Sequence, residues 1–167
     1  MKMPLKSMES LYIMSKKLLE YLYSSGGTRR YHNRPKVDQN VKEHSWGVAL
    51  TITILHPNPS ANLLKAATLH DCSEKVYGDF LSPAKIAFPE LRELDKKCND
   101  LFWNDIATDT GITYPTLTDE EQLWLNFADM YECYLFAREE GIEDIIVDGL
   151  NRANAIADEL RKLGYEI

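Results

Sequence analysis

The sequence predicts an all-α fold of about six helices in a single domain that spans residues 1–167. Two observations predict this fold. Apolar residues recur at helical spacing over most of the chain, and turns that contain Gly or Pro separate the periodic segments. A chain of 167 residues is also long enough to bury a hydrophobic core without disulfides or a structural metal.

Three helices are predicted in the N-terminal half, over residues 5–23, 40–55 and 61–76. Asn40 or Gln39 can cap the second helix. Within that helix, residues 49–54 are rich in β-branched side chains and nearly alternating, which suits a strand. We nevertheless predict a helix, because an i, i+4, i+7 spacing of apolar residues continues from Val41. Ser60 is predicted to cap the third helix.

Three more helices are predicted in the C-terminal half, over residues 89–108, over residues 118–139 and between Gly141 and Gly164. Before them, Ser82 and Pro83 have the pattern of an N-cap followed by the first helical residue of a short turn. Leu94 belongs to the apolar stripe predicted for the helix at residues 89–108. Thr118 and Glu121 have the spacing of a capping box.

The composition argues against several classes of protein. A net charge of −7 disfavours a nucleic-acid partner, because nucleic-acid-binding proteins normally carry a basic stripe. The three cysteines include no Cys-x-x-Cys pair, which suits a reducing compartment and disfavours a disulfide framework or a thiolate zinc site. No signal peptide and no apolar run long enough for a bilayer are visible. We therefore expect a cytoplasmic protein that binds neither nucleic acid nor membranes.

Residues 28–39 form a basic stretch in an acidic protein, and they show no periodicity, so we predict a loop. The cations in this stretch are Arg29, Arg30, Arg34 and Lys36. A solvated charged connection is the simpler interpretation. The local reversal of charge favours a second one, in which a guanidinium such as that of Arg30 binds phosphate through two hydrogen bonds while Tyr31 stacks on a sugar or base.

Three predicted helices each carry a metal-binding type of side chain on an apolar face. These side chains are His44 in the second helix, the adjacent pair His70-Asp71 in the third, and Asp129 in the middle of the helix at residues 118–139. A single buried His is more often a hydrogen-bonded core residue, and a single Asp has a similar explanation. An ionised carboxylate among alanines is costly, however, unless a positive group meets it. One divalent cation would explain all three helices, because imidazole and carboxylate together suit first-row metals.

Two further acidic residues follow the His-Asp pair. Glu74 lies four residues after His70 and three after Asp71, so all three are predicted to project from one face of the helix. Asp79 comes directly after Gly78, which is predicted to end the helix. These two carboxylates are therefore predicted to lie near the metal ligands.

The order His, His-Asp, Asp resembles that of the HD-domain metal-dependent phosphohydrolases, and the resemblance covers roughly residues 28–135. It implies an HD-domain helical bundle with the metal site between its central helices. The implied ligands are His44, His70, Asp71 and Asp129. They would fill four positions of an octahedral ion and leave two for a water and a phosphate oxygen. The native metal stays open among Mn, Co, Fe, Zn and Mg.

Further residues match particular branches of this family. His70-Asp71-x-x-Glu74-x-x-x-x-Asp79, with Pro83 and Lys85 after it, is similar to the 5′-deoxynucleotidase branch. Arg30-Tyr31-His32 is similar to the Arg-Trp-His of small phage-type HD proteins, which include dATP triphosphohydrolases, although Tyr31 stands where those proteins carry Trp.

The resemblance also implies roles for these side chains. Glu74 would act in proton transfer, and Asp79 would orient the nucleophile or protonate the leaving oxygen. Arg30 and Lys85 would neutralise charge that develops on the phosphate. A homo-oligomer is implied as well.

Three functions follow from these observations. A triphosphohydrolase would release deoxynucleoside and triphosphate from dATP, and the abundant positive charge around Arg30 favours it. A 5′-deoxynucleotidase that releases phosphate from a dNMP is the alternative. The non-enzymatic alternative is a degenerate HD domain with a structural metal or a nucleotide-sensing role, but such a domain does not need Glu74 and Asp79.

Overall fold

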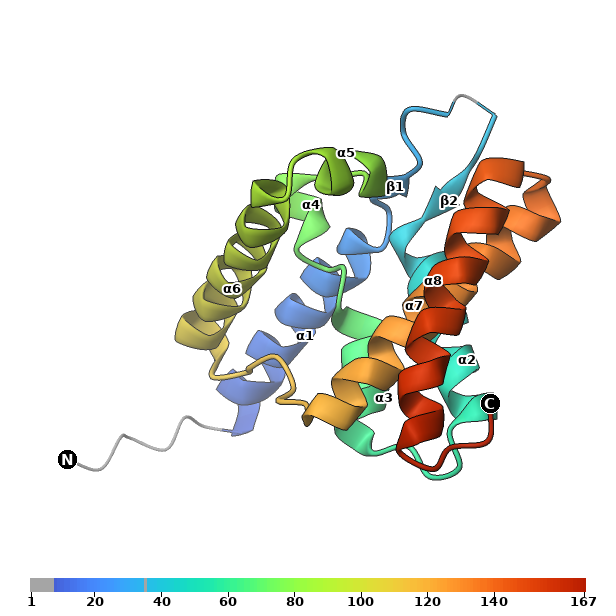
Figure 1. Ribbon diagram of the computed structural model, residues 1–167. Coiled ribbons are helices and arrows are strands. Elements are labelled where there is room, and N and C mark those ends of the chain that lie inside the picture. The colour runs from blue at the N-terminus through green and yellow to red at the C-terminus, as the bar shows by residue number, and fades with distance from the viewer. Residues whose placement is uncertain (1–7, 35) are drawn as a thin grey trace. The chain divides into compact units, whose positions relative to one another are not determined.

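The computed structural model describes residues 8–34 and 36–167, and this part of the chain is mainly helical, as predicted (Figure 1). The helices are α1 (Met8–Ser25), α2 (Val41–Leu55), α3 (Ala61–Leu69), α4 (Glu74–Tyr77), α5 (Ser82–Ala87), α6 (Glu90–Thr110), α7 (Asp119–Glu140) and α8 (Glu143–Lys162). Residues 5–7 of the first predicted helix lie outside the described residues. None of the described helices combines the length and the apolar character needed to cross a membrane.

The contacts divide the chain into two compact units. The first unit contains α1, α4, α5 and α6, and consists of the chain up to Thr28 together with Cys72–Thr113. The second unit contains the remaining elements, and consists of Arg29–Asp71 together with Tyr114–Ile167. The expectation of a single domain stays a prediction.

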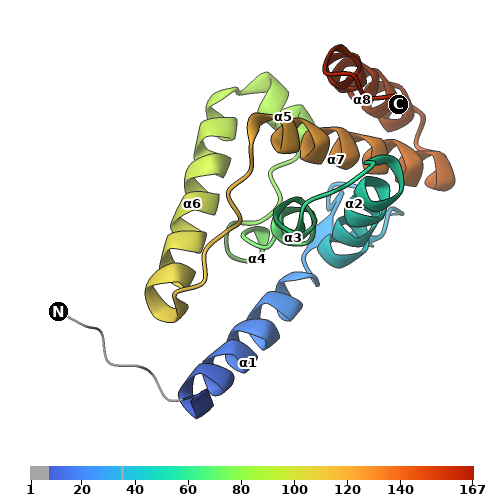
Figure 2. The same cartoon turned by 90° about the horizontal axis from the view of Figure 1, so that it is seen from below.

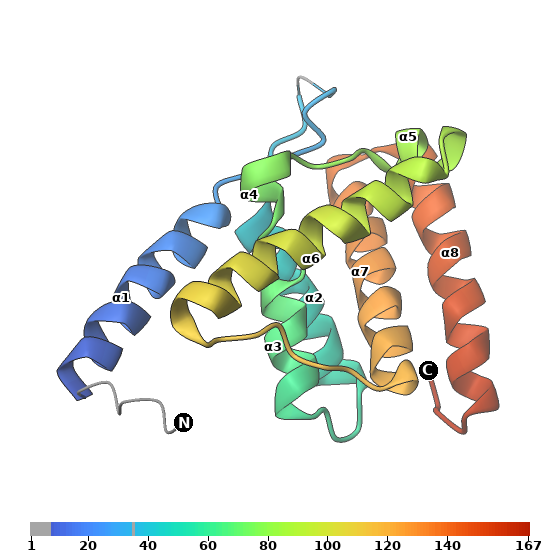
Figure 3. The ribbon, with the colours of Figure 1, turned by 90° about the vertical axis from the view of Figure 1, so that its left-hand side faces the viewer.

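The second unit has a helical core around α7. Helix α8 runs beside α7 (Figures 1 and 3), while α2 and α3 pack on α7 and on each other (Figure 2). The most buried members of this core are Val48, Ile52, Leu63, Ala66, Ala67, Trp124, Ala128 and Leu160. Gly149 lets α8 approach closely, because a Cβ atom at this position would lie 3.3 Å from the backbone of Tyr134 on α7.

Two predicted caps form in this unit. Asn40 is the N-cap of α2, and its side chain accepts the Glu43 N–H while the Glu43 carboxylate accepts the Asn40 N–H, both at 3.1 Å. Thr118 and Glu121 form the capping box predicted for α7. The Glu121 carboxylate also accepts the hydroxyl of Ser60, the N-cap of α3. One carboxylate therefore holds the beginnings of two helices.

The predicted helix over residues 61–76 is broken, which corrects the sequence prediction. Helix α3 ends at Leu69, the chain turns through residues 70–73, and α4 begins at Glu74. At the break, the His70 imidazole Nδ1 donates to the Ala67 carbonyl at 2.9 Å. A continuing helix would offer that carbonyl to the N–H of Asp71. His70, Asp71 and Glu74 therefore do not share one helical face, and that prediction is wrong.

Smaller corrections concern loops and exposure. The stretch at residues 28–39 is not entirely loop, because β1 (Arg29–Arg30) pairs in antiparallel fashion with β2 (Gln39–Asn40). Leu81, rather than Ser82, is the N-cap of α5. Leu94 is 44% exposed, so the predicted apolar stripe of α6 is buried only in part. The buried residues of α6 include Phe102, whose ring stacks on Tyr21 of α1. Both helices belong to the first unit, in which α6 follows α5 (Figure 3).

Candidate metal centre

The four residues predicted as metal ligands all belong to the second unit, and His44 lies at their centre. His44 is fully buried on α2, on the face that also buries Val48. Its Nε2 atom lies 3.0 Å from Oδ1 of Asp129 and 3.2 Å from Nε2 of His70. It also lies 3.5 Å from Oδ2 of Asp71. Helices α2 and α7 and the C-terminal end of α3 thus bring their polar side chains to one place.

The break after α3 places the His-Asp pair at this site. His70 is the C-cap of α3, and Asp71 follows it in the turn. Their donor atoms, His70 Nε2 and Asp71 Oδ2, are 3.4 Å apart. Adjacent residues of a regular helix point about 100° apart, so the turn allows two neighbours to face the same point.

The distances from His44 Nε2 to the other three donor atoms are close to those between neighbouring ligands of one divalent ion. Zinc and magnesium hold nitrogen and oxygen ligands at about 2.1 Å, so neighbouring ligands of an octahedral ion lie about 3.0 Å apart. The distances from His44 Nε2 to the other three donor atoms, 3.0 to 3.5 Å, are close to this spacing. Within the described residues, two groups have their ligand atoms within 4.8 Å of one another, namely His44 with His70 and Asp71, and His44 with Asp129 and Cys133. The second unit therefore contains side-chain groups that can hold a metal ion.

The outward hydrogen bonds of both imidazoles leave their Nε2 lone pairs facing inward. A carbonyl can only accept, so the Nδ1 atom of His70 carries the proton that the Ala67 carbonyl accepts. The Nδ1 atom of His44 bonds to the carboxylate of Glu132 in the same way. Two lone pairs and the carboxylates of Asp71 and Asp129 then lie near one another, and such a set of acceptors favours a cation among them.

The pKa shifts of His44 and Asp129 are those expected at a site that favours positive charge. Burial and the charge of Arg30 lower the pKa of His44, but its hydrogen bonds with Asp129 and Glu132 outweigh both and raise that pKa to about 9. Burial alone would raise the pKa of Asp129, but its hydrogen bond with His44 and the nearby positive charges hold it far below its usual value. A metal ion would thus take the place of the proton on His44, and Asp129 is already ionised as a ligand must be.

Arg30 reaches the same site from β1. Its Nη1 atom donates to Oδ2 of Asp71 at 2.7 Å, and its Nη2 atom contacts Sγ of Cys133 at 3.5 Å. Burial would raise the pKa of Asp71, and the charges of His70 and Arg30 instead lower it. The predicted phosphate-binding guanidinium therefore lies beside a predicted metal ligand and pairs with it.

Tyr31 has a packing role in the second unit. Its ring stacks on Phe136 of α7 with the ring centres 5.5 Å apart and an angle of 12° between the ring planes. Burial also raises the pKa of Tyr31. Tyr31 adopts a left-handed backbone conformation with φ of 50°, which non-glycine residues seldom do. Phe136 covers one face of the Tyr31 ring, so a nucleotide could stack only on the other face. Stacking of Tyr31 on a nucleotide stays a prediction.

The other three predicted site residues belong to the first unit. Glu74 begins α4, and Asp79 follows Gly78, whose φ of 82° ends that helix as predicted. Lys85 lies on α5, and its Nζ atom forms an ion pair with Oδ2 of Asp95 at 2.8 Å. The structure therefore brings Arg30 together with the four predicted ligands in one unit, and describes Glu74, Asp79 and Lys85 in the other.

Sequence reasoning missed two residues of α7 at this site. Glu132 and Cys133 lie three and four residues after Asp129, and therefore on the same face of the helix. Burial raises the pKa of the Cys133 thiol to about 12. An acidic residue at i+3 from a predicted ligand was the signal that could have identified Glu132.

Comparisons with known proteins add nothing to this geometry. No protein-family model matches the sequence. No curated protein matches it either.

Proposed function

We propose that this protein is a metal-dependent phosphohydrolase of the HD-domain type that acts on deoxynucleotides. The observation that supports the proposal is the approach of His70, Asp71 and Asp129 to Nε2 of His44, at 3.0 to 3.5 Å. The sequence order of these residues is that of the HD-domain motif. A structural metal site closes its coordination with protein ligands, whereas four ligands leave positions open on an octahedral ion.

The chain's own residues supply the surroundings that hydrolysis needs. A divalent cation at this site would lower the pKa of a bound water and polarise a phosphoryl oxygen. His44 and His70 present their lone pairs because their Nδ1 protons are held elsewhere. Asp71 and Asp129 would hold the ion and balance its charge. Arg30 stands next to Asp71, from where its guanidinium would stabilise negative charge that develops on a phosphate.

Proton transfer is proposed for the carboxylates of the first unit. Glu74 would accept the proton of the attacking water, and Asp79 would orient that water or protonate the leaving oxygen. Lys85 would neutralise phosphate charge, in which case it exchanges its ion pair with Asp95 for the substrate.

The favoured reaction is release of triphosphate from dATP, on the strength of the Arg-Tyr-His motif and the local positive charge. Ion pairs within the chain favour a second candidate, a 5′-deoxynucleotidase. Arg29 donates to the Val37 carbonyl at 2.9 Å and lies 3.7 Å from Asp38. Arg34 pairs with Asp144 at the start of α8. Two of the cations that would hold a triphosphate are therefore already paired, and a monophosphate needs fewer of them.

The experiment is a screen of dNTPs and dNMPs with Mn²⁺, Co²⁺, Zn²⁺ and Mg²⁺ in which each product is identified. Triphosphate from dATP supports the first candidate, and orthophosphate from dAMP with intact dATP supports the second. The variant Asp129→Asn is the control, and it is expected to lose turnover with every metal. If the metal-loaded protein turns over none of these nucleotides, the proposal is wrong and a degenerate, non-enzymatic HD domain is favoured instead.

A further inference from the structure

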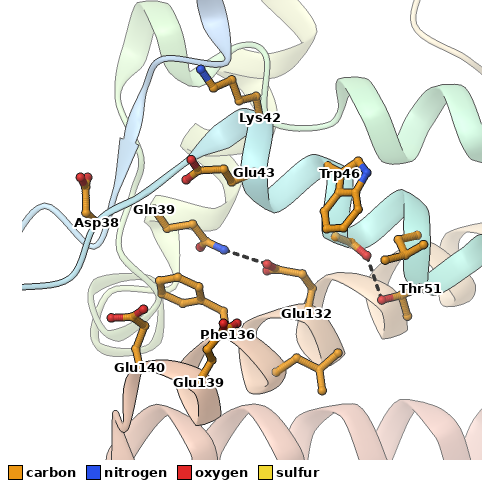
Figure 4. A pocket seen from close by; sticks show the side chains of 13 residues that line it. Asp38, Gln39, Lys42, Glu43, Trp46, Thr51, Glu132, Phe136, Glu139 and Glu140 are labelled. Atoms are coloured by element: carbon orange, nitrogen blue, oxygen red, sulfur yellow. Dashed lines mark hydrogen bonds between the residues drawn. The ribbon is translucent and has the colours of Figure 1, made fainter.

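Glu132 is a buried carboxylate with both oxygens in use. It lies on α7, and only 7% of its surface is exposed. Its Oε1 atom accepts the amide Nε2–H of Gln39 at 2.7 Å, which Figure 4 shows as a dashed line, and its Oε2 atom bonds to Nδ1 of His44. Gln39 belongs to β2 and is itself 2% exposed. A carboxylate is costly to bury unless it is hydrogen-bonded, and here β2 and α2 each provide a hydrogen-bond partner for the Glu132 carboxylate of α7.

The packing beside Glu132 depends on a glycine of α2. A Cβ atom at Gly47 would lie 2.6 Å from Cγ of Glu132 and 3.1 Å from its Oε1. Gly47 has no left-handed backbone conformation that would call for glycine. Glycine costs about 1 kcal/mol relative to alanine inside a helix. Gly47 is one turn after His44, so the missing side chain makes room for Glu132 directly beside the imidazole.

We propose that Glu132 is a positioning residue that holds His44 in the tautomer with the proton on Nδ1, so that the Nε2 lone pair faces the other metal ligands. Gln39 orients Glu132 in turn. A carboxylate in this position also makes the imidazole a stronger ligand, because it stabilises positive charge on the ring. The inference rests on the metal site of the proposed function and gives that site a residue outside its four ligands.

The two imidazoles of the site are oriented by different means. His70 donates to a backbone carbonyl, that of Ala67, which no substitution of a side chain removes. His44 depends on the side chain of Glu132. A variant at position 132 therefore changes the orientation of one ligand and leaves the other in place.

The test is the metal affinity of the full-length variant Glu132→Gln, titrated with Co²⁺ and Zn²⁺ by calorimetry. Gln can still fill the space but loses the charge, and a loss of affinity of about 10- to 100-fold is expected. The matched control is Glu139→Gln, because Glu139 is an exposed carboxylate of the same helix and lines the same surface pocket as Glu132 (Figure 4). The metal affinity of this control is expected to equal that of the wild type. Equal affinities for Glu132→Gln and wild type would overturn the inference, even if the thermal stability of the variant falls.

A second measurement uses the wild-type chain and so does not depend on a variant that folds. Two-bond ¹H–¹⁵N correlation spectra of the Zn²⁺-loaded protein identify the protonated nitrogen of His44. The proton is expected on Nδ1, and a proton on Nε2 would overturn the inference. A wild type that binds no metal would overturn both this inference and the proposed function, whereas metal binding without nucleotide hydrolysis would count against the proposed function alone.

Discussion

At the scale of single residues, one oxygen of Asp71 lies near both the Arg30 guanidinium and the two candidate histidine ligands. Its Oδ2 atom accepts from Arg30 at 2.7 Å, and the same atom lies 3.4 to 3.5 Å from the Nε2 atoms of the two histidines. A metal ion bound there would share Oδ2 with the guanidinium. Because like charges repel at such distances, we expect Arg30 to weaken metal binding while it offers positive charge to a phosphate.

Replacement of Arg30 by Gln is therefore expected to have opposite effects on two measurements. Metal affinity should rise several-fold, because a neighbouring positive charge is gone. The value of kcat/KM for the nucleotide should fall by about 10²- to 10³-fold, because charge that develops on the phosphate loses its partner. Calorimetry and steady-state kinetics on the same preparation measure both. The control is Arg161→Gln, which removes a cation that pairs with Asp158 within α8 instead. A lower metal affinity in Arg30→Gln would mean that Arg30 orients Asp71 and does not compete with the ion.

At the scale of elements, the caps of α3 and α7 share the carboxylate of Glu121. This carboxylate accepts the Ser60 hydroxyl and the Thr118 N–H, and both bonds lower the pKa of Glu121 below its usual 4.5. A carboxyl group whose pKa is lower in the folded than in the unfolded state stabilises the fold when the pH is above its pKa in the unfolded state. That stabilisation is lost as the pH falls through the pKa of the group in the folded state.

The variant Glu121→Gln is accordingly expected to be less stable than the wild type by about 1 kcal/mol at pH 7. The difference should shrink as the pH falls below about 4.5, the usual pKa of Glu, because the wild-type carboxylate then takes up a proton. Urea unfolding at a series of pH values measures this difference. Glu139→Gln, an exposed carboxylate without a capping role, is the control. A difference that stays constant down to pH 3 would contradict the account.

The contact between α7 and α8 depends on Gly149. A Cβ atom there would lie 3.3 Å from the backbone of Tyr134, which cannot move aside as a flexible side chain can. We expect Gly149→Ala to destabilise the protein by about 1 to 3 kcal/mol, as overpacking does in well-packed cores. The control is Gly27→Ala, where the new Cβ atom would meet only the Ser24 carbonyl at 3.5 Å. Chemical unfolding of the two variants compares them, and a Gly149→Ala protein as stable as the wild type would show that α8 shifts without cost.

Elements with local signals were predictable from the sequence, and those set by contacts between distant residues were not. Helices α2 and α7 begin and end close to their predicted bounds because their caps are written in adjacent residues, Asn40 with Glu43 and Thr118 with Glu121. The break at His70 was missed because a side chain takes the carbonyl of Ala67 from the helix. The pairing of β1 with β2 was missed because two-residue strands carry no alternation.

The candidate site shows the same division. His44, His70, Asp71 and Asp129 could be named because each is a metal-binding type of residue on the apolar face of a predicted helix. The position of Glu132, three residues after Asp129, was the only local signal for it, and its bond with an imidazole 88 residues earlier in the chain could not be read from the sequence. Arg34 pairs with Asp144, 110 residues later in the chain. The sequence does not show this contact, so every cation of the loop was counted as available to bind phosphate.

At the scale of the whole molecule, the four candidate ligands come from segments that are far apart in the sequence but belong to the same compact unit. They lie on α2, at the end of α3 and on α7, whose core positions Val48, Ala67 and Ala128 pack together in one hydrophobic cluster. The core thus fixes the helices, and the helices fix the ligands. A metal ion that binds only this folded arrangement would stabilise it, by about 2.7 kcal/mol when the ion is present at 100 times its dissociation constant.

The most direct test of the central claim is anomalous diffraction from crystals of the full-length protein grown with Mn²⁺. The account predicts one strong peak at about 2.1 Å from Nε2 of His44 and Nε2 of His70, within bonding distance of the carboxylates of Asp71 and Asp129. The same peak should be missing in crystals of Asp129→Asn. A protein saturated with Mn²⁺ that shows no peak among these four side chains, or shows its only peak elsewhere, would contradict the account.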